Sequence, residues 1–437
     1  MSTKRPVAMV QEAMGSASRL EAAQEYLNVS YSQCLDAFIV SLNQTSDRGR
    51  WFTSTKELQL ASSPFCIACR SVATLRLRVG DDTPPRLLAA ADAPHPGSTR
   101  VPRLRARAVT WERPSTAELG RPLYALVDVN LLAFRGGYNG SIEDVSWPAR
   151  LRVLNLGNSF DQPVANVSWP LSLKVLRFGR SFNQSLAEVT FPPSLLLLTF
   201  CQDFDQPIAN VSWPPSLEEL ELGCSFNQSL DEVTFPPLLL RLTFGRRFNQ
   251  PISNVSWPES LQDLQLSEDF NQAVEGVAWP VSLQTILFDD GFNQPIASVK
   301  WPPCLRSLQF GLAFDQPVAR VTWPASLKIL AFGFAVDDNG VYLLSHFNQA
   351  FDEAVWPASL ERLTLGDEFD QSLHGLGTWM PNLESFTLLV EDKNLLVGIE
   401  WPKSLKELIV FQGKSLDGVD IPQSVEVTPL QMHRDYD

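Results

Sequence analysis

The chain has 437 residues, is 44% hydrophobic and carries a formal net charge of -14, with the acidic excess concentrated in the part beyond residue 133. The apolar content, which includes 26 Phe and 12 Trp, is enough for a packed core and excludes a largely disordered chain. An acidic surface repels phosphate backbones, so this composition disfavours a nucleic-acid partner for the later part of the chain.

The first residues contain no sustained apolar segment of the kind that a secretory signal needs. No uncharged run anywhere in the sequence is long enough to span a bilayer. From the sequence we therefore expect no membrane association and a cytoplasmic location.

Residues 1–128 form an N-terminal region with little periodicity. Within it we predict a helix at 7–27, a degenerate coil near 42–63 and a flexible linker near 80–120, where Pro, Ala and Arg are frequent. The rest of the chain divides into a repeat array at 129–427 and a polar tail at 428–437.

The array is marked by an aromatic residue that returns every 22 residues, too long a period for a helix or a strand and too short for a domain. These lead aromatics are Tyr138, Phe160, Phe182, Phe204, Phe226, Phe248, Phe270, Phe292 and Phe314. The next lead, Phe347, comes 33 residues after Phe314, which indicates an insertion at a coil corner within 334–346. The spacing predicts a stack of similar coils.

Each coil continues with a second aromatic, usually followed by proline, and then with the pattern L-x-x-L-x-F/L. The pattern is that of a short strand with one apolar side, as in Leu217, Leu220 and Leu222. Proline cannot donate to a strand ladder, so it marks the segment that leads into the strand. We predict a curved β-solenoid with one short parallel strand per 22-residue coil.

Two rows of equivalent residues allow both a structural and a binding interpretation. We interpret the first, a polar row after the lead aromatic, as a ladder that bonds successive corners and not as a ligand platform. We interpret the second, the aromatic before proline, as a buried row and not as a stacking site for bases or sugars. The structural residues in these rows are Asn183, Asn227, Asn249 and Asn293, and Trp169, Trp213, Trp257, Trp279, Trp301 and Trp323.

The combined motif "FNQPI…V.WP.SL..L.FG" resembles the FNIP repeat, a 22-residue relative of the leucine-rich repeat. The resemblance covers roughly residues 129–427. It implies a leucine-rich-repeat-like solenoid and a role as an interaction platform, and it brings no common catalytic residues with it.

The outward side chains of the strands vary from coil to coil and are the candidate partner-binding surface. The candidates are Lys174, Arg177, Glu218, Glu219, Glu221, Arg241, Asp263 and Gln265. Glu219, Arg241 and Asp263 occupy one position in successive coils, so ion pairing between coils is an alternative account of their charges.

No nucleophile elbow, phosphate-binding glycine loop or metal-spaced histidine cluster occurs, so we expect no enzyme, no metal and no cofactor. The Cys66-Cys69 pair is a weak zinc signal, and we interpret the six cysteines as free buried thiols. The predicted function is a non-catalytic scaffold or module that binds a protein partner. The alternatives are a structural or adhesive element that self-associates and, as a minor one, a substrate adaptor of a ubiquitin ligase.

Overall fold

The computed structural model describes residues 108–112, 129–135, 137–333, 335–337, 340–342, 345–389, 393–411, 416 and 418–430. The predicted helix at 7–27 and the degenerate coil near 42–63 lie outside the described residues. So do most of the predicted linker and the end of the predicted tail.

The described part of the chain forms one long sheet of fifteen strands, in which each strand pairs in parallel with the next strand of the array. The predicted fold class, a parallel solenoid with one short strand per coil, is confirmed. The strands are β1 (Ala108–Glu112), β2 (Leu131–Arg135), β3 (Val153–Asn155), β4 (Val175–Arg177), β5 (Leu197–Thr199), β6 (Glu219–Glu221), β7 (Arg241–Thr243), β8 (Asp263–Gln265), β9 (Thr285–Leu287), β10 (Ser307–Phe310), β11 (Ile329–Phe332), β14 (Arg362–Leu365), β15 (Ser385–Leu388), β16 (Glu407–Phe411) and β17 (Glu426–Leu430).

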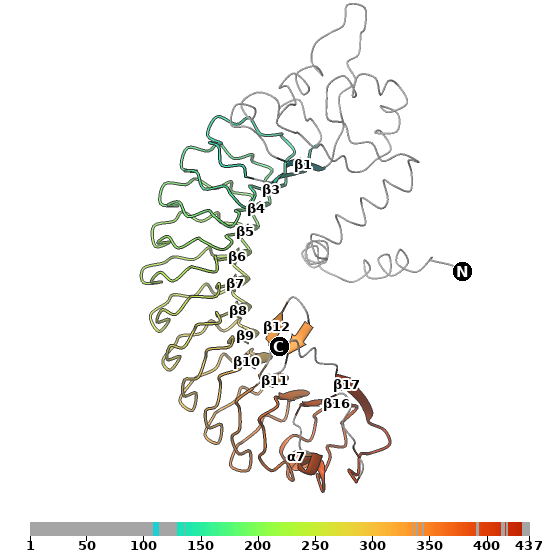
Figure 1. The fold of residues 1–437 in the computed structure, drawn as a ribbon. Coiled ribbons are helices and arrows are strands. Elements are labelled where there is room, and N and C mark those ends of the chain that lie inside the picture. Colours follow the sequence, from blue (N-terminus) through green and yellow to red (C-terminus); the bar gives the residue numbers. More distant parts are fainter. Residues whose placement is uncertain are drawn as a thin grey trace, which may run out of the picture. The chain divides into compact units, whose positions relative to one another are not determined.

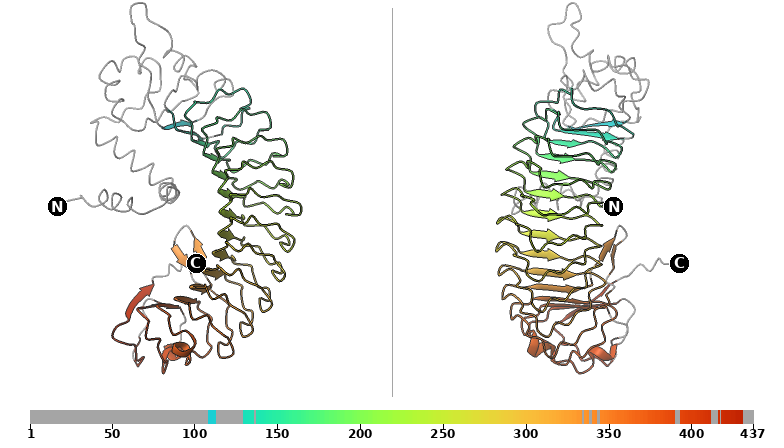
Figure 2. Two further views of the ribbon diagram at one scale, coloured as in Figure 1. Left: turned by 180° about the vertical axis from the view of Figure 1, so that it is seen from behind. Right: turned by 90° about the vertical axis from the view of Figure 1, so that its left-hand side faces the viewer.

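The coils stack into an arc whose inner side is the sheet and whose outer side is made of the return segments (Figures 1 and 2). A 22-residue period places the same residue of each coil directly above its equivalent, so the register runs Leu154, Leu176, Leu198 and Leu220 from strand to strand. Each of these central strand residues is 0% exposed. Burial therefore depends on the neighbouring coils, as expected for a one-dimensional array.

The lead aromatics form a continuous stack through the interior of the coils. Phe248 is 0% exposed, and its ring centroid lies 6.0 Å from that of Phe226 and 6.1 Å from that of Phe270. The ring centroid of Phe244, the residue just after β7, lies 4.0 Å from that of Phe248. This stack and the central strand leucines belong to one continuous hydrophobic core.

The second aromatic row runs parallel to the first, along the segment that precedes each strand. The ring of Trp257 stacks on Phe235 at 6.0 Å and on Trp279 at 6.3 Å. Trp169, Trp257, Trp301 and Trp323 are buried, whereas Trp213 and Trp279 are partly exposed. The indole Nε1 of every one of these six residues is enclosed and has no hydrogen-bond partner among the described residues. The row therefore acts through ring packing alone, which explains why phenylalanine replaces tryptophan at Phe191 and Phe235.

The polar row after the lead aromatic forms a ladder along the array. The Oδ1 atom of Asn227 accepts hydrogen bonds from the backbone N–H of Asn249 at 2.9 Å and from Nε2 of Gln250 at 3.0 Å. Asn183, Asn249 and Asn293 make the same pair of contacts to the coil that follows each of them. Every rung thus satisfies a backbone donor that would otherwise lack a partner at the corner.

We expect Asn227→Ala to lower the free energy of unfolding by about 0.5–1.5 kcal/mol, because the backbone N–H of Asn249 and the side chain of Gln250 lose their acceptor. Urea unfolding followed by circular dichroism measures this change. Asn227→Asp is the matched control, since Asp205 already forms the equivalent rung to Asn227 N–H at 2.9 Å. Equal losses in both variants would contradict the ladder interpretation.

The predicted insertion forms a hairpin of two antiparallel strands, β12 (Ala335–Asp337) and β13 (Gly340–Tyr342), on the inner side of the arc (Figure 1). The array continues across it without a break, because β11 pairs directly with β14. Short helical segments occur only near the C-terminal end of the described array, as α7 (Leu376–Trp379) and the 3-10 helix at Lys393–Leu396.

Two predicted boundaries need correction. Ala108–Glu112 lies inside the segment predicted as a linker but forms β1, which pairs with β2 over its whole length. At the other end, β17 continues to Leu430, three residues into the predicted tail. The sheet is therefore longer at both ends than the span 129–427.

Candidate partner-binding face

The strand side chains that point away from the core lie on the inner side of the arc, where each strand has the burial pattern half-buried, buried, half-buried or one close to it. The alternation follows from the two-residue period of a strand, which sends the central leucine inward and its two neighbours outward. We call this surface the concave face. Its candidate residues are Lys174, Arg177, Glu218, Glu219, Glu221, Arg241, Asp263 and Gln265.

A chain of ion pairs crosses three coils of the concave face. Arg241 Nη1 lies 2.7 Å from Glu219 Oε1, and Arg241 Nε lies 3.0 Å from Asp263 Oδ2. Glu219 is 7% exposed, and its burial raises the pKa of the carboxyl although Arg241 acts in the opposite direction. The pairing that the repeat register suggested is therefore present, and it uses one guanidinium for two carboxylates.

The remaining candidates on the concave face make no side-chain hydrogen bond or ion pair with any described residue. They are Lys174, Arg177, Glu218, Glu221 and Gln265, and all five are half-buried. The charges of Lys174, Arg177, Glu218 and Glu221 are thus not neutralised by ion pairs between coils. The structure brings Glu218, Glu219 and Glu221 together on β6 and the residue just before it, one strand away from Arg241.

Arg177, Thr199 and Glu221 form a second row, at the carboxyl ends of β4, β5 and β6. Thr199 is not among the candidates named from the sequence. It is 9% exposed, and its Oγ1 has no partner among the described residues. The Cys201 thiol lies close by. Burial raises the pKa of that thiol, the carboxylate of Glu221 raises it further, and the guanidinium groups of Arg177 and Arg180 lower it.

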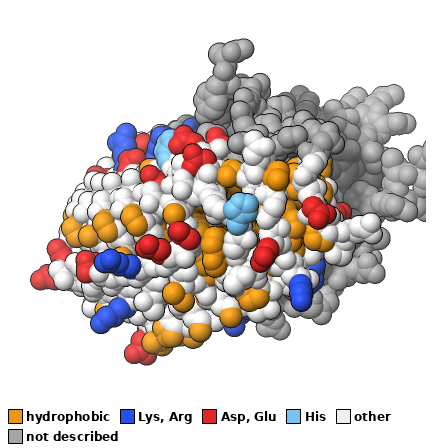
Figure 3. All heavy atoms as spheres, turned by 90° about the horizontal axis from the view of Figure 1, so that it is seen from below, with side chains coloured by type: hydrophobic (Ala, Val, Ile, Leu, Met, Phe, Trp, Pro, Cys, Tyr) orange, Lys and Arg blue, Asp and Glu red, His pale blue; other side chains and the backbone are white. Residues whose placement is uncertain are grey.

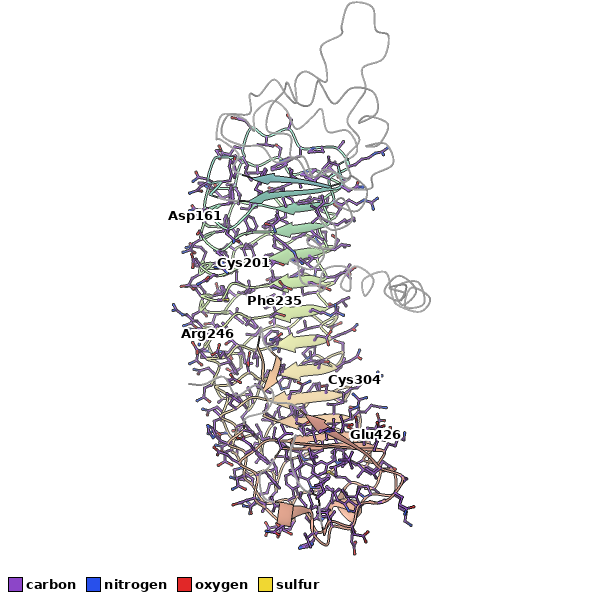
Figure 4. All side chains as sticks on the ribbon, turned by 45° about the vertical axis from the view of Figure 1, so that its right-hand side comes forward. Asp161, Cys201, Phe235, Arg246, Cys304 and Glu426 are labelled. Carbon is purple, nitrogen blue, oxygen red and sulfur yellow. The ribbon has the colours of Figure 1, made fainter. Side chains whose placement is uncertain are left out.

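The cysteine prediction was half right. Cys201, Cys224 and Cys304 are free thiols, but Cys201 is half-buried and the other two are exposed. Figure 4 shows Cys201 beyond the arrowheads of the strands and Cys304 before their starts. The other three cysteines lie outside the described residues. No set of three His, Cys, Asp or Glu side chains that could hold a metal ion is found in the described part of the chain.

Two adjacent carboxylates that sequence reasoning did not single out are half-buried at the corner after β9. Asp289 Oδ1 accepts a hydrogen bond from the backbone N–H of Asp290 at 3.0 Å. Burial, reinforced by the charges of Asp290 and Glu268, raises the pKa of Asp289 to about 6. In most coils this corner carries glycine, as at Gly245 and Gly311, and that departure from the repeat was the available signal.

The corner at Asp289 should make stability depend on pH. The pKa of Asp289 is higher in the folded chain than its ordinary value of 3.8, so folding favours the protonated carboxyl. That stabilisation is fully present below about pH 4 and is lost as the pH rises through about 6. We expect Asp289→Asn to be more stable than the wild type at pH 7.5, by about 1–2 kcal/mol after allowance for partial exposure.

Thermal unfolding of both proteins at pH 4, 6 and 7.5 measures this effect. The difference between them should widen as the pH rises and nearly vanish at pH 4. Glu275→Gln, at an exposed glutamate, serves as the control and should show no such trend. A constant difference across the three pH values would rule out titration of Asp289 as its cause.

Among the described residues, no helix has the length and apolar character needed to cross a membrane. At the C-terminal end of the array, hydrophobic side chains appear among charged groups of both signs (Figure 3). Val427 is 37% exposed, although its register partner Leu408 is 0% exposed.

Comparisons with known proteins agree with this geometry. The FNIP repeat model matches residues 138–181, 182–225, 226–269 and 292–335. No curated protein matches the chain in sequence. Among solved structures, the circular leucine-rich-repeat protein CroV588 is similar with a TM-score of 0.58 and 29% identity, over 81% of this chain and 56% of that one.

A second solved structure, the TLR13–ssRNA13 complex, is similar with a TM-score of 0.55 and 15% identity, over 83% of this chain and 55% of that one. At that identity the likeness concerns the fold alone. The chain spans just over half the length of either protein. The matched residues and the parallel sheet together identify residues 138–269 and 292–335 as FNIP repeats within a leucine-rich-repeat-like solenoid.

Proposed function

We propose that the chain is a non-catalytic module or scaffold that binds a protein partner through its concave face. The observation that carries the proposal is the set of half-buried charged residues without partners, above all Arg177, Glu218 and Glu221. Charges that are partly desolvated and unpaired are costly for the free protein, and a partner with complementary charges offsets that cost.

The fold class supports this reading. Leucine-rich-repeat-like solenoids typically serve in protein interaction and are generally not enzymes. The core of the array is uniform, because the lead aromatics and the strand leucines repeat from coil to coil. The side chains of the concave face, in contrast, change from coil to coil. Variation on a constant frame is what recognition of one partner requires, since the frame fixes where each side chain is presented.

Charge reversal tests the proposal. We expect Glu218→Lys together with Glu221→Lys to weaken binding of the physiological partner, recovered by affinity purification with the wild type, by at least about tenfold, because both carboxylates would face cations of the partner. Glu219 is left unchanged because it is buried and paired with Arg241.

The matched control reverses Glu188 and Glu275, two exposed glutamates of the return segments. Both double variants should melt within a few degrees of the wild type, since neither removes a hydrogen bond or an ion pair between described side chains and each replaces one charged group by another. If the Glu218/Glu221 variant keeps every partner and the control variant loses them, the binding surface lies on the outer side of the arc and the proposal is wrong.

A second candidate function is a structural element that self-associates. The exposed Val427 at the end of the core favours it, because the C-terminal end of the solenoid leaves apolar surface open. Pro429 in β17 opposes it, since proline withholds a donor from any strand that would be added at this edge. Sedimentation of the wild type and of Val427→Glu separates the two: a concentration-dependent oligomer that the substitution abolishes indicates self-association, and a monomer favours recognition.

A further inference from the structure

Arg177 on β4 is a half-buried guanidinium without a partner. None of the described residues forms a hydrogen bond or an ion pair with it, and its Nε atom is enclosed by protein. Its charge reaches the Cys201 thiol, but a neutral thiol is no counterion. Arginine is seldom buried without a carboxylate or phosphate, because its five donors all need acceptors.

Thr199 is the register neighbour of Arg177 on β5. It is 9% exposed, and its Oγ1 is enclosed and unpartnered as well. Because Nε of Arg177 and Oγ1 of Thr199 are enclosed, neither atom can bond a partner directly, and the terminal nitrogens of Arg177 are the donors that a carboxylate can reach. Charge-assisted hydrogen bonds of this kind are the stronger ones.

Glu221 is the register neighbour of Thr199 on the other side, on β6. Together with Glu218 and Glu219 it gives this strand three carboxylates. Among the described residues, only Arg241 forms an ion pair with any of the three, and Arg241 is shared with Asp263. This end of the row therefore suits a cationic side chain. The row Arg177–Thr199–Glu221 is thus a donor site for a carboxylate at one end and an acceptor site for a cation at the other.

The distance between the two ends follows from strand stacking. Neighbouring strands lie about 4.8 Å apart, so β4 and β6 are separated by about 10 Å along the array. In a polyproline II segment, which has three residues per turn and a rise of about 3.1 Å, residues i and i+3 lie on the same side about 9.3 Å apart. An extended segment of this type that runs along the array places one side chain at each end of the row.

We propose, as a refinement that rests on the proposed function, that the partner contributes an extended protein segment with an acidic and a basic side chain three residues apart. The acidic side chain accepts hydrogen bonds from the terminal nitrogens of Arg177. The basic side chain meets Glu218 and Glu221. The row thereby selects for a pair of opposite charges at a fixed spacing and disfavours segments that carry a single sign of charge.

Selection from a displayed library of random dodecapeptides tests this on the full chain. Peptides that bind the wild type should share one acidic and one basic residue three positions apart. Peptides selected with Arg177→Glu as bait should carry basic residues at both positions. Peptides selected with the double variant Glu218→Lys and Glu221→Lys should carry acidic residues at both positions. This readout does not depend on the direction in which a peptide lies, and Arg320→Glu, at an exposed outer position, is the control that should leave the motif unchanged.

Peptide selection distinguishes a failure of the row from a failure of the whole concave face. Peptides that keep their motif with the Arg177 variant, yet are lost on charge reversal elsewhere on the concave face, would overturn the row and leave the proposed function standing. Peptides whose binding ignores every substitution on the concave face would overturn both. Melting curves of each bait confirm that a lost peptide reflects a changed surface and not an unfolded chain.

Discussion

Trp257→Ala should destabilise the middle of the array by about 3–5 kcal/mol, the usual cost of removing a large buried ring from a close-packed core. The ring is 9% exposed and stacks on both Phe235 and Trp279, so its loss leaves a cavity that three coils share. Because each coil is stabilised only by its neighbours, the damage should spread along the array from this point, and thermal unfolding should broaden. Differential scanning calorimetry together with hydrogen exchange measures both effects.

Trp257→Phe is the control. The indole N–H of Trp257 has no hydrogen-bond partner among the described residues, and phenylalanine occupies the same position at Phe191 and Phe235. The smaller aromatic should therefore cost no more than about 1.5 kcal/mol. An alanine variant that melts like the wild type would mean that the ring does not support the core and that the aromatic row is available to a ligand.

Gly179→Ala should cost about 3 kcal/mol or more, near the upper end for overpacking. A Cβ atom at this corner would overlap the backbone carbonyl of Gly157 in the preceding coil. Backbone cannot rotate out of the way as a flexible side chain can, so the two coils must separate and disturb the aromatic stack between Phe160 and Phe182. Urea unfolding gives the loss, and hydrogen exchange locates it in the coils that contain β3 and β4.

Cys201→Ala is the matched control, since Cys201 occupies the same row one coil further along and already carries a Cβ atom. Its corner differs from the others: the carbonyl of Cys201 accepts a hydrogen bond from the N–H of Cys224 at 3.0 Å. We expect the cysteine variant to stay within about 1 kcal/mol of the wild type. If both alanine variants are equally stable, close approach of the coils is not what requires glycine at this row.

The sequence predicted the array because one repeat determines all the others. The 22-residue period determines where each strand falls, so β3 to β9 lie where the leucine pattern predicts them. The same period aligns Glu219 with Arg241 and Asp263, as the strand register confirms. A period is a local and redundant signal. The period remains recognisable after the replacement of single residues, because the neighbouring coils carry the same pattern.

The departures from the period could not be interpreted in the same way. The strand β1 follows a segment rich in proline and arginine, and Ala108 pairs with Leu131, so its offset from β2 departs from the 22-residue period. The enclosure of Thr199 and the raised pKa of Asp289 depend on which long or charged side chains lie in the adjacent coils. A sequence pattern states which side of a strand faces outward, but the burial of an outward residue is decided by its neighbours in space.

The hairpin of β12 and β13 shows how freely this array accepts added chain. Asp315 Oδ1 accepts a hydrogen bond from the backbone N–H of Asn348 at 3.0 Å, although these residues are 33 apart in the sequence and the residues of other rungs are 22 apart. A rung of the ladder thus forms between any two corners that lie next to each other, whatever the length of chain between them. Recombination could enlarge this corner to a folded domain without altering the core, and a designer could graft a binding loop at the same place, beside the concave face.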